Sequence, residues 1–153
     1  MVTVRAATIV DAEAVEGACT QVAAEGEWIG PELPLAPGWQ DDFRAAVGSP
    51  DSTWFVADVD GLIVGAVFVR KERGLAHVGM AIVDSHRGRG IGRRLLEAAI
   101  DWARATQCHK IVLEVWPHNA RARRLYEAAG FTDEGYLRRQ YRRRSGALWD
   151  VIA

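Results

Sequence analysis

The sequence predicts a single α/β domain in which helices cover both faces of a mixed sheet. Short runs rich in β-branched and aromatic residues are spaced along the chain, and amphipathic segments with a 3.6-residue period separate them. The expected order of elements is βααβββαβαββ, which combines hairpins with helical connections. At 153 residues and 49% hydrophobic content, the chain is long enough for one domain with a full core.

The first half of the chain is expected to begin with a strand and two helices and to continue into a hairpin. In order, the expected elements are a strand at 2–7, a helix from Asp11 to about residue 24, a helix at 40–47, and strands at 52–58 and 62–69. Prolines at positions 31, 34 and 37 make residues 25–38 irregular. Asp60-Gly61 is typical of a two-residue turn and predicts that the strands on either side of it pair.

The second half alternates strands with helices and ends in another hairpin. The expected elements are a strand at 75–83, a helix that ends near residue 106, a strand at 110–116, a helix at 119–129, and strands at 131–144 and 147–152. Pro117 stops the middle strand, Gly130 ends the helix that follows it, and Ser145-Gly146 is the expected turn of the last hairpin.

The most informative local feature is the glycine run Arg87-Gly88-Arg89-Gly90-Ile91-Gly92, which precedes an amphipathic helix. The apolar stripe of that helix is formed by Leu95, Leu96, Ala99, Ile100 and Ala103. A glycine turn that opens a helix exposes backbone N–H groups, and the helix dipole adds partial positive charge there. With arginines at 87, 89, 93 and 94, the run predicts a site for a phosphate-bearing ligand. A plain basic surface turn is the alternative.

The spacing of the glycines narrows the choice of ligand. A dinucleotide-binding fingerprint needs G-x-G-x-x-G, whereas Gly88, Gly90 and Gly92 are each two positions apart. A P-loop closes with Lys followed by Ser or Thr, but the residues at 93 and 94 are both arginine. Arg87, Gly90 and Gly92 instead fit the pattern Arg-x-x-Gly-x-Gly.

A second motif follows downstream, within residues 113–131. It consists of Asn119, Ala122, Leu125-Tyr126 and Gly130-Phe131. Together with Arg-x-x-Gly-x-Gly, this motif resembles the GCN5-related N-acetyltransferase (GNAT) family, whose glycine loop holds the pyrophosphate of acetyl-CoA through backbone amides. The resemblance covers about residues 50–152, and the N-terminal third resembles the family only in the order of its strand and helices.

The resemblance implies the acyl-CoA N-acyltransferase fold over residues 1–153, with a single-domain, mixed and mostly antiparallel sheet of about seven strands. It also implies transfer of an acetyl group from acetyl-CoA to a primary amine of a small molecule or peptide, in a ternary complex. A non-catalytic acyl-CoA-binding sensor is the alternative. The residues expected to bind the cofactor are Met80, Ala81, Ile82, Arg87, Gly88, Arg89, Gly90, Ile91, Gly92, Arg93 and Asn119. The first three would act through the backbone, polarising the thioester carbonyl.

The expected reaction needs a base, because an amine with a pKa near 10.4 costs about 4.6 kcal/mol to deprotonate at pH 7 and an α-amine about 1.4 kcal/mol. Glu114 is the candidate base, because it is a charged residue inside an apolar strand and stands at the position of the family's proposed base. The alternative is that Glu114 is a structural partner for an arginine. Tyr126 is the candidate acid for the CoA thiolate, with a plain core role as alternative. Asn119 can cap its helix as well as contact the CoA arm.

The acceptor side carries a weaker pattern. Glu25, Glu27 and Trp28 fall where the family builds its acceptor wall, and acids beside a tryptophan suit a cationic amine. A solvated loop with one anchoring tryptophan fits the same residues. Residues 1–69 carry a net charge of −9 and residues 70–153 carry +8, which indicates two surfaces of opposite ligand preference.

Overall composition argues against several partners. The net charge of −1 argues against nucleic acid, although a tyrosine is interleaved with arginines at 138–144. No apolar run approaches the roughly 18–20 residues of a membrane span and the N-terminus lacks a signal-peptide pattern, so we expect no membrane partner and a cytoplasmic location. No His, Cys and Asp cluster has metal spacing, so no metal is expected. The family resemblance is compatible with a homodimer.

Overall fold

In the computed structural model, which describes residues 1–153, the chain forms two units, Met1–Ile111 and Val112–Ala153. The first unit contains β1 (Val2–Ala6), the short 3-10 helix η1 (Ile9–Asp11), α1 (Ala12–Glu25), α2 (Trp39–Gly48), β2 (Ser52–Val59), β3 (Leu62–Glu72), β4 (Leu75–Ile82), the 3-10 helix η2 (Asp84–His86), α3 (Ile91–Ala105) and the start of β5 (Lys110–Val112). The second contains α4 (Ala120–Ala128), β6 (Tyr136–Arg142) and β7 (Leu148–Ile152). No helix combines the length and the apolar character needed to cross a bilayer.

Five strands form one sheet in the order β1-β2-β3-β4-β5, and the pairs β1–β2, β2–β3 and β3–β4 are antiparallel. The hairpin between β2 and β3 turns at Asp60 and Gly61, as expected, with φ values of 51° and 91°. The amide of Gly61 donates to Oδ1 of Asp58 at 2.7 Å. Positive φ at both central residues is what a two-residue turn between twisted strands requires.

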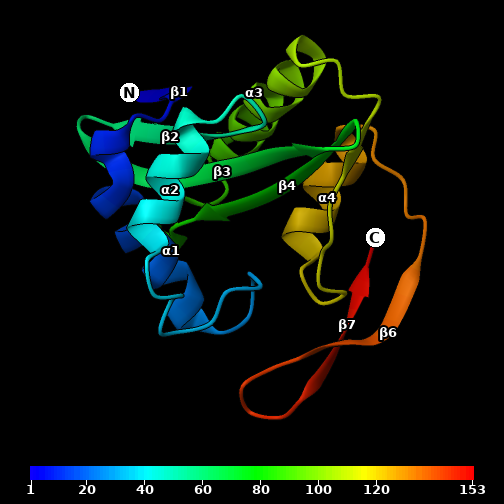
Figure 1. Cartoon of the computed structure of the whole chain (residues 1–153). Helices are drawn as coiled ribbons and strands as arrows, with labels where there is room; N and C mark the ends of the chain where they lie inside the picture. The colour runs from blue at the N-terminus through cyan, green and yellow to red at the C-terminus, as the bar shows by residue number, and fades with distance from the viewer. The chain divides into compact units, whose positions relative to one another are not determined.

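The side chains of β3 alternate between the two faces of the sheet, and helices cover each face. Val67 packs on one face in a cluster that includes Leu95 of α3. Its neighbour Ala66 belongs to the cluster that includes Val15 of α1 and Phe43 of α2. Figure 1 shows α1 and α2 on one side of these strands and α3 on the other. The expectation of helices on both faces is confirmed in this unit.

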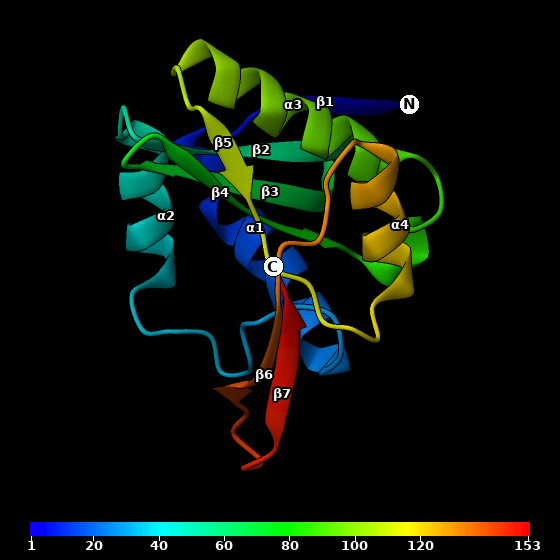
Figure 2. The same ribbon diagram turned by 90° about the vertical axis from the view of Figure 1, so that its right-hand side faces the viewer.

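The C-terminal hairpin is a sheet of its own. β6 and β7 pair antiparallel and run side by side in Figure 2. The seven expected strands are therefore all present, but five lie in one sheet and two in another. β6 begins at Tyr136 and not at residue 131, because the amide of Phe131 still bonds back to the carbonyl of Tyr126 at the end of α4.

The strand expected at 110–116 is shorter than the sequence pattern indicates. β5 ends at Val112, so Glu114 lies beyond the strand and not inside it. The apolar residues beyond Val112 do not extend β5. Val115 pairs instead with Ile152 of β7. Each of these residues donates its amide to the carbonyl of the other at 2.9 Å.

A partly buried ion pair, Arg5 with Asp11, ties β1 to the start of α1. Asp11 is 7% exposed and accepts hydrogen bonds from Nη1 and Nη2 of Arg5 at 2.8 and 3.0 Å, and from the amide of Thr8 at 2.8 Å. The Arg5 guanidinium holds the pKa of Asp11 below its usual value. Because this carboxylate stabilises the fold only when ionised, its contribution is present above about pH 4 and is lost as the pH falls through the folded-state pKa.

Replacing Asp11 by asparagine is therefore expected to lower the free energy of unfolding at pH 7 by about 2 kcal/mol and to weaken its dependence on pH below about 4. Urea unfolding followed by circular dichroism across this pH range measures both effects. Asp41→Asn is the matched control, because Asp41 is 87% exposed and pairs with Arg44 on the same helix. Equal losses of stability in the two variants would contradict the argument.

Candidate functional site

The glycine run lies between η2 and α3, and its backbone conformation requires glycine at two positions. Gly88 and Gly90 have φ values of 74° and 80°, in the left-handed region that costs other residues about 1–2 kcal/mol. Gly90 is also the N-cap residue at which the chain enters α3. A Cβ atom at either glycine would meet no atom within 4 Å, so the requirement comes from the backbone conformation and not from crowding within the chain.

The backbone amides of residues 88–93 donate no hydrogen bond within the chain. The first amide of α3 with an acceptor belongs to Arg94, which bonds to the carbonyl of Gly90 at 3.3 Å. The first turn of α3 contains no acidic side chain that could cap these donors. Unpaired amides at the positive end of a helix dipole suit an anion such as a pyrophosphate.

The four arginines around the run differ in what they contact. Arg87 is 10% exposed at its side chain and is bound by its own chain, whereas Arg93 is 79% exposed and pairs with Glu97 at 3.0 Å. Arg94 donates to the carbonyl of Val2 at 2.7 Å. Arg89 is exposed and makes no hydrogen bond or ion pair with the chain. Arg89, Arg93 and Arg94 are all exposed, and Arg89 is the one among them without a partner in the chain.

The end of β4 carries the residues expected to act through the backbone. Ala81 is buried, Met80 and Ile82 are half-buried, and all three pair with β3. The partner of Ile82 is Gly65, where a Cβ atom would meet the carbonyl of Ala81 and the side chain of Ile82 at 3.2 Å. The absence of a side chain at Gly65 thus lets β3 and β4 approach closely at the end of β4, just before the glycine run.

The segment after α1 is held by Glu25, the last residue of that helix. Its Oε1 accepts from the indole Nε1 of Trp28 at 3.1 Å, and both of its carboxylate oxygens accept from Arg87. Trp28 also packs against the core cluster under α1 and α2. Glu27 is exposed. Trp28 is therefore an anchoring residue, and the carboxylate of Glu25 already has partners within the chain.

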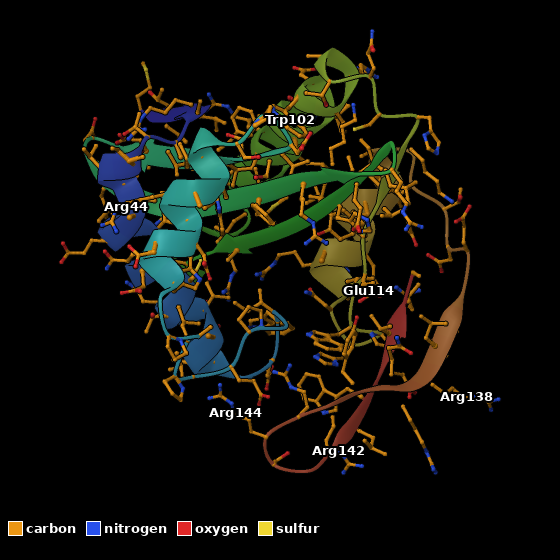
Figure 3. The ribbon with its side chains drawn as sticks, in the orientation of Figure 1. Arg44, Trp102, Glu114, Arg138, Arg142 and Arg144 are labelled. Carbon is orange, nitrogen blue, oxygen red and sulfur yellow. The ribbon has the colours of Figure 1, made fainter.

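In the second unit, Glu114 is exposed and its carboxylate has a tyrosine partner. Oε2 accepts a hydrogen bond from the phenol of Tyr141 on β6 at 2.5 Å, and this bond raises the pKa of Tyr141. The alternative expected from the sequence was that Glu114 pairs with an arginine, whereas in the structure its partner is the phenol of Tyr141. Sequence reasoning did not identify Tyr141 as the partner of Glu114, because the two residues lie 27 positions apart in the chain. They meet because the hairpin of β6 and β7 returns to this segment, where Ile152 pairs with Val115. Figure 3 shows Glu114 among the side chains of this unit.

Tyr126 and Asn119 belong to α4. Burial raises the pKa of Tyr126, whose ring lies 5.8 Å from the ring of Phe131 between centroids. Because its pKa is raised, the phenol keeps its proton at neutral pH. Its hydroxyl makes no hydrogen bond with another residue, so this proton is available to be donated. Asn119 accepts the amide of Ala122 at 3.2 Å, which confirms its capping role.

The basic run at 138–144 is not a uniform surface. Arg138, Arg142 and Arg144 are exposed and spread along β6 and the turn that follows it (Figure 3). Arg143 is 6% exposed, and its guanidinium carbon lies 4.4 Å from the ring centroid of Trp149 and 5.2 Å from that of Trp116. One arginine therefore packs inside an aromatic cluster that sequence reasoning did not identify.

Comparison with known proteins agrees with these local features. A sequence model of the acetyltransferase (GNAT) family matches residues 21–131. The N-alpha-acetyltransferase RimI of Mycobacterium tuberculosis is 34% identical over 116 residues, which is 69% of this chain and 67% of that protein. An uncharacterised N-acetyltransferase of Methanocaldococcus jannaschii is 34% identical over 90 residues, and the match spans 58% of each chain.

A solved structure shows the same fold over almost the whole chain. A GNAT superfamily phosphinothricin acetyltransferase from Sinorhizobium meliloti, in complex with acetyl-CoA, gives a TM-score of 0.86 with 19% identity. The match covers 99% of this chain and 85% of that one. The unpaired amides of the glycine run, the fold and a family match that covers most of the sequence agree, and we conclude that this protein belongs to the GNAT acetyltransferase family.

Proposed function

We propose that the protein transfers an acetyl group from acetyl-CoA to a primary amine of a small molecule or peptide, by direct attack in a ternary complex. The observation that carries this proposal is the set of unpaired amides at residues 88–93, which suits the pyrophosphate of the donor. The acetyl-CoA complex of the Sinorhizobium meliloti acetyltransferase supports the choice of donor. Residues 1–153 act in this proposal as one N-acetyltransferase domain.

The donor is bound mainly by backbone groups. Amides of the glycine run bond to the pyrophosphate oxygens, and the exposed guanidinium groups of Arg89 and Arg93 add positive charge. Asn119 contacts the CoA arm with the part of its amide that does not cap α4. Backbone amides near Ala81 and Ile82 polarise the thioester carbonyl and stabilise the negative charge that forms on its oxygen during attack.

The proposed chemistry removes two protons from the acceptor nitrogen and adds one to the leaving thiolate. Glu114 takes a proton from the ammonium form of the acceptor, directly or through a water molecule, and the free amine then attacks the thioester carbon. A C–N bond forms, the C–S bond breaks as the nitrogen releases its second proton to solvent, and Tyr126 gives its proton to the departing CoA thiolate. The amide product and CoA leave, Glu114 releases the proton that it took up to solvent, and the tyrosinate recovers a proton from solvent.

The acceptor class is tested with the purified chain and a panel of amines, using the CoA thiol released as the readout. The panel contains a peptide with a free N-terminus, a free amino acid, a polyamine and an aminoglycoside. We expect turnover with at least one class. Binding of acetyl-CoA without turnover on any amine would replace the proposal with an acyl-CoA sensor, and a lack of acetyl-CoA binding would overturn it.

A further inference from the structure

The guanidinium group of Arg87 is held on every side by its own chain. Nη1 and Nη2 donate to the two carboxylate oxygens of Glu25 at 2.8 and 2.6 Å. Nε donates to the carbonyl of Ile82 at 2.8 Å, and Nη1 also lies 3.3 Å from Oδ1 of Asp84. Arg87 thus joins the end of α1 to the end of β4 and to η2, immediately before the glycine run. A phosphate would have to compete with an existing bidentate carboxylate for this side chain.

The carboxylate of Glu25 is fixed in turn by its surroundings. α1 ends after this residue, where Gly26 takes a left-handed conformation with φ of 73°. The indole N–H of Trp28 bonds to the same carboxylate at 3.1 Å from within the segment that follows. Glu25 is 31% exposed at its side chain and Arg87 10%, so solvent screens the pair only in part.

We propose that Glu25 is a positioning residue for the acetyl-CoA loop. This proposal rests on the function proposed above. The bidentate pair orients Arg87, and Arg87 anchors the turn at residues 87–90 to β4, so that the amides of residues 88–93 keep the geometry that the pyrophosphate needs. Glu25 then acts on donor binding through Arg87, and not by contact with the acceptor amine.

The pair has features that a glutamine or a lysine cannot reproduce. A glutamine at position 25 keeps the size of the side chain but offers one acceptor oxygen instead of two and no charge. Arg87 would keep the carbonyl of Ile82 and lose its bidentate partner. A lysine at position 87 has no planar fork and cannot bond to Glu25 and Ile82 in the same arrangement.

The test compares Glu25→Gln, Arg87→Gln and the double variant with the parent protein. Isothermal titration of acetyl-CoA gives Kd, and steady-state assays give kcat and the KM for each substrate. We expect each single variant to raise the acetyl-CoA Kd about tenfold with kcat changed less than about threefold. The double variant should bind no more weakly than the weaker single variant, because the two residues act through one pair.

Two further variants keep the test decisive. Glu25→Asp retains the charge on a shorter side chain and should recover part of the lost affinity. Asp101→Asn removes an exposed ion pair with Arg104 on α3, whose atoms are 3.7 Å apart, and should leave Kd unchanged. Thermal unfolding of every variant shows whether it is folded at the assay temperature.

The outcomes separate this inference from the proposed function. If the parent protein does not bind acetyl-CoA, the proposed function fails, and this inference fails with it. If the parent binds and Glu25→Gln binds equally well, the inference alone is overturned. If Glu25→Gln raises the KM of the amine and leaves the acetyl-CoA Kd unchanged, Glu25 contacts the acceptor and the positioning role is wrong.

Discussion

Replacing Tyr126 by phenylalanine is expected to lower kcat about a hundredfold while changing the acetyl-CoA Kd less than about threefold. The substitution removes one hydroxyl and keeps the ring, which lies against Phe131. The hydroxyl has no partner in the chain, so its loss leaves no unsatisfied group and the fold should keep its stability. Steady-state kinetics with a reactive amine and calorimetric titration of acetyl-CoA measure the two quantities.

The raised pKa of Tyr126 adds a pH dependence to this prediction. A phenol acts as an acid only while protonated, and a pKa above the ordinary value near 10 extends that range upward. The parent protein should therefore show no loss of kcat from this group below about pH 10. Tyr136→Phe is the matched control, because its hydroxyl bonds to Asp150 on the hairpin and has no proposed part in the chemistry. Unchanged turnover in Tyr126→Phe would exclude the acid role.

Replacing Glu114 by glutamine is expected to lower kcat/KM about a hundredfold or more for an alkyl amine, and much less for an amine whose pKa is near 8. The amide of glutamine cannot take up the proton, but it can still accept the hydrogen bond from Tyr141. The cost of deprotonating the acceptor at pH 7 falls from about 4.6 to about 1.4 kcal/mol between these amines. The loss should therefore follow the basicity of the acceptor.

A series of amines of similar size and graded pKa measures this dependence for the parent and the variant. Tyr141→Phe is the matched control, because it keeps the carboxylate of Glu114 and removes only its hydrogen bond. We expect that variant to lose less than about tenfold in kcat/KM for every amine. A loss in Glu114→Gln that is the same for all amines would indicate a structural partner of Tyr141 and not a base.

Much of the fold could be predicted from the sequence because its signals are local. The apolar stripe of α3 repeats every 3.6 residues, and Leu95 and Ala99 are buried as that period requires. Asp60-Gly61 predicts its hairpin because few other residue pairs adopt positive φ at both turn positions. Asn119 caps α4 through a bond that spans three residues. Each of these features depends on neighbours within one or two turns of chain.

The ends of strands were harder to predict, because they depend on which partner a segment finds. Residues 110–116 form one apolar run in the sequence, yet β5 stops at Val112 and Val115 pairs with Ile152 instead. Glu114 therefore lies between the end of β5 and the bridge at Val115. The apolar and polar residues still alternate in sequence there, although the strand itself has ended. No local pattern could show that change of partner, because Ile152 is distant in sequence and becomes a neighbour only through the last hairpin.

The sequence by itself determined the order of the elements, the glycine run at the start of α3 and the family to which both motifs point, because periodicity, turn chemistry and motif spacing act over short stretches of chain. Only the tertiary structure decided which polar groups meet. Arg87 pairs with Glu25 across 62 residues, and Glu114 receives its hydrogen bond from Tyr141 across 27. Such contacts depend on the packing of whole elements against one another, which no local sequence pattern specifies.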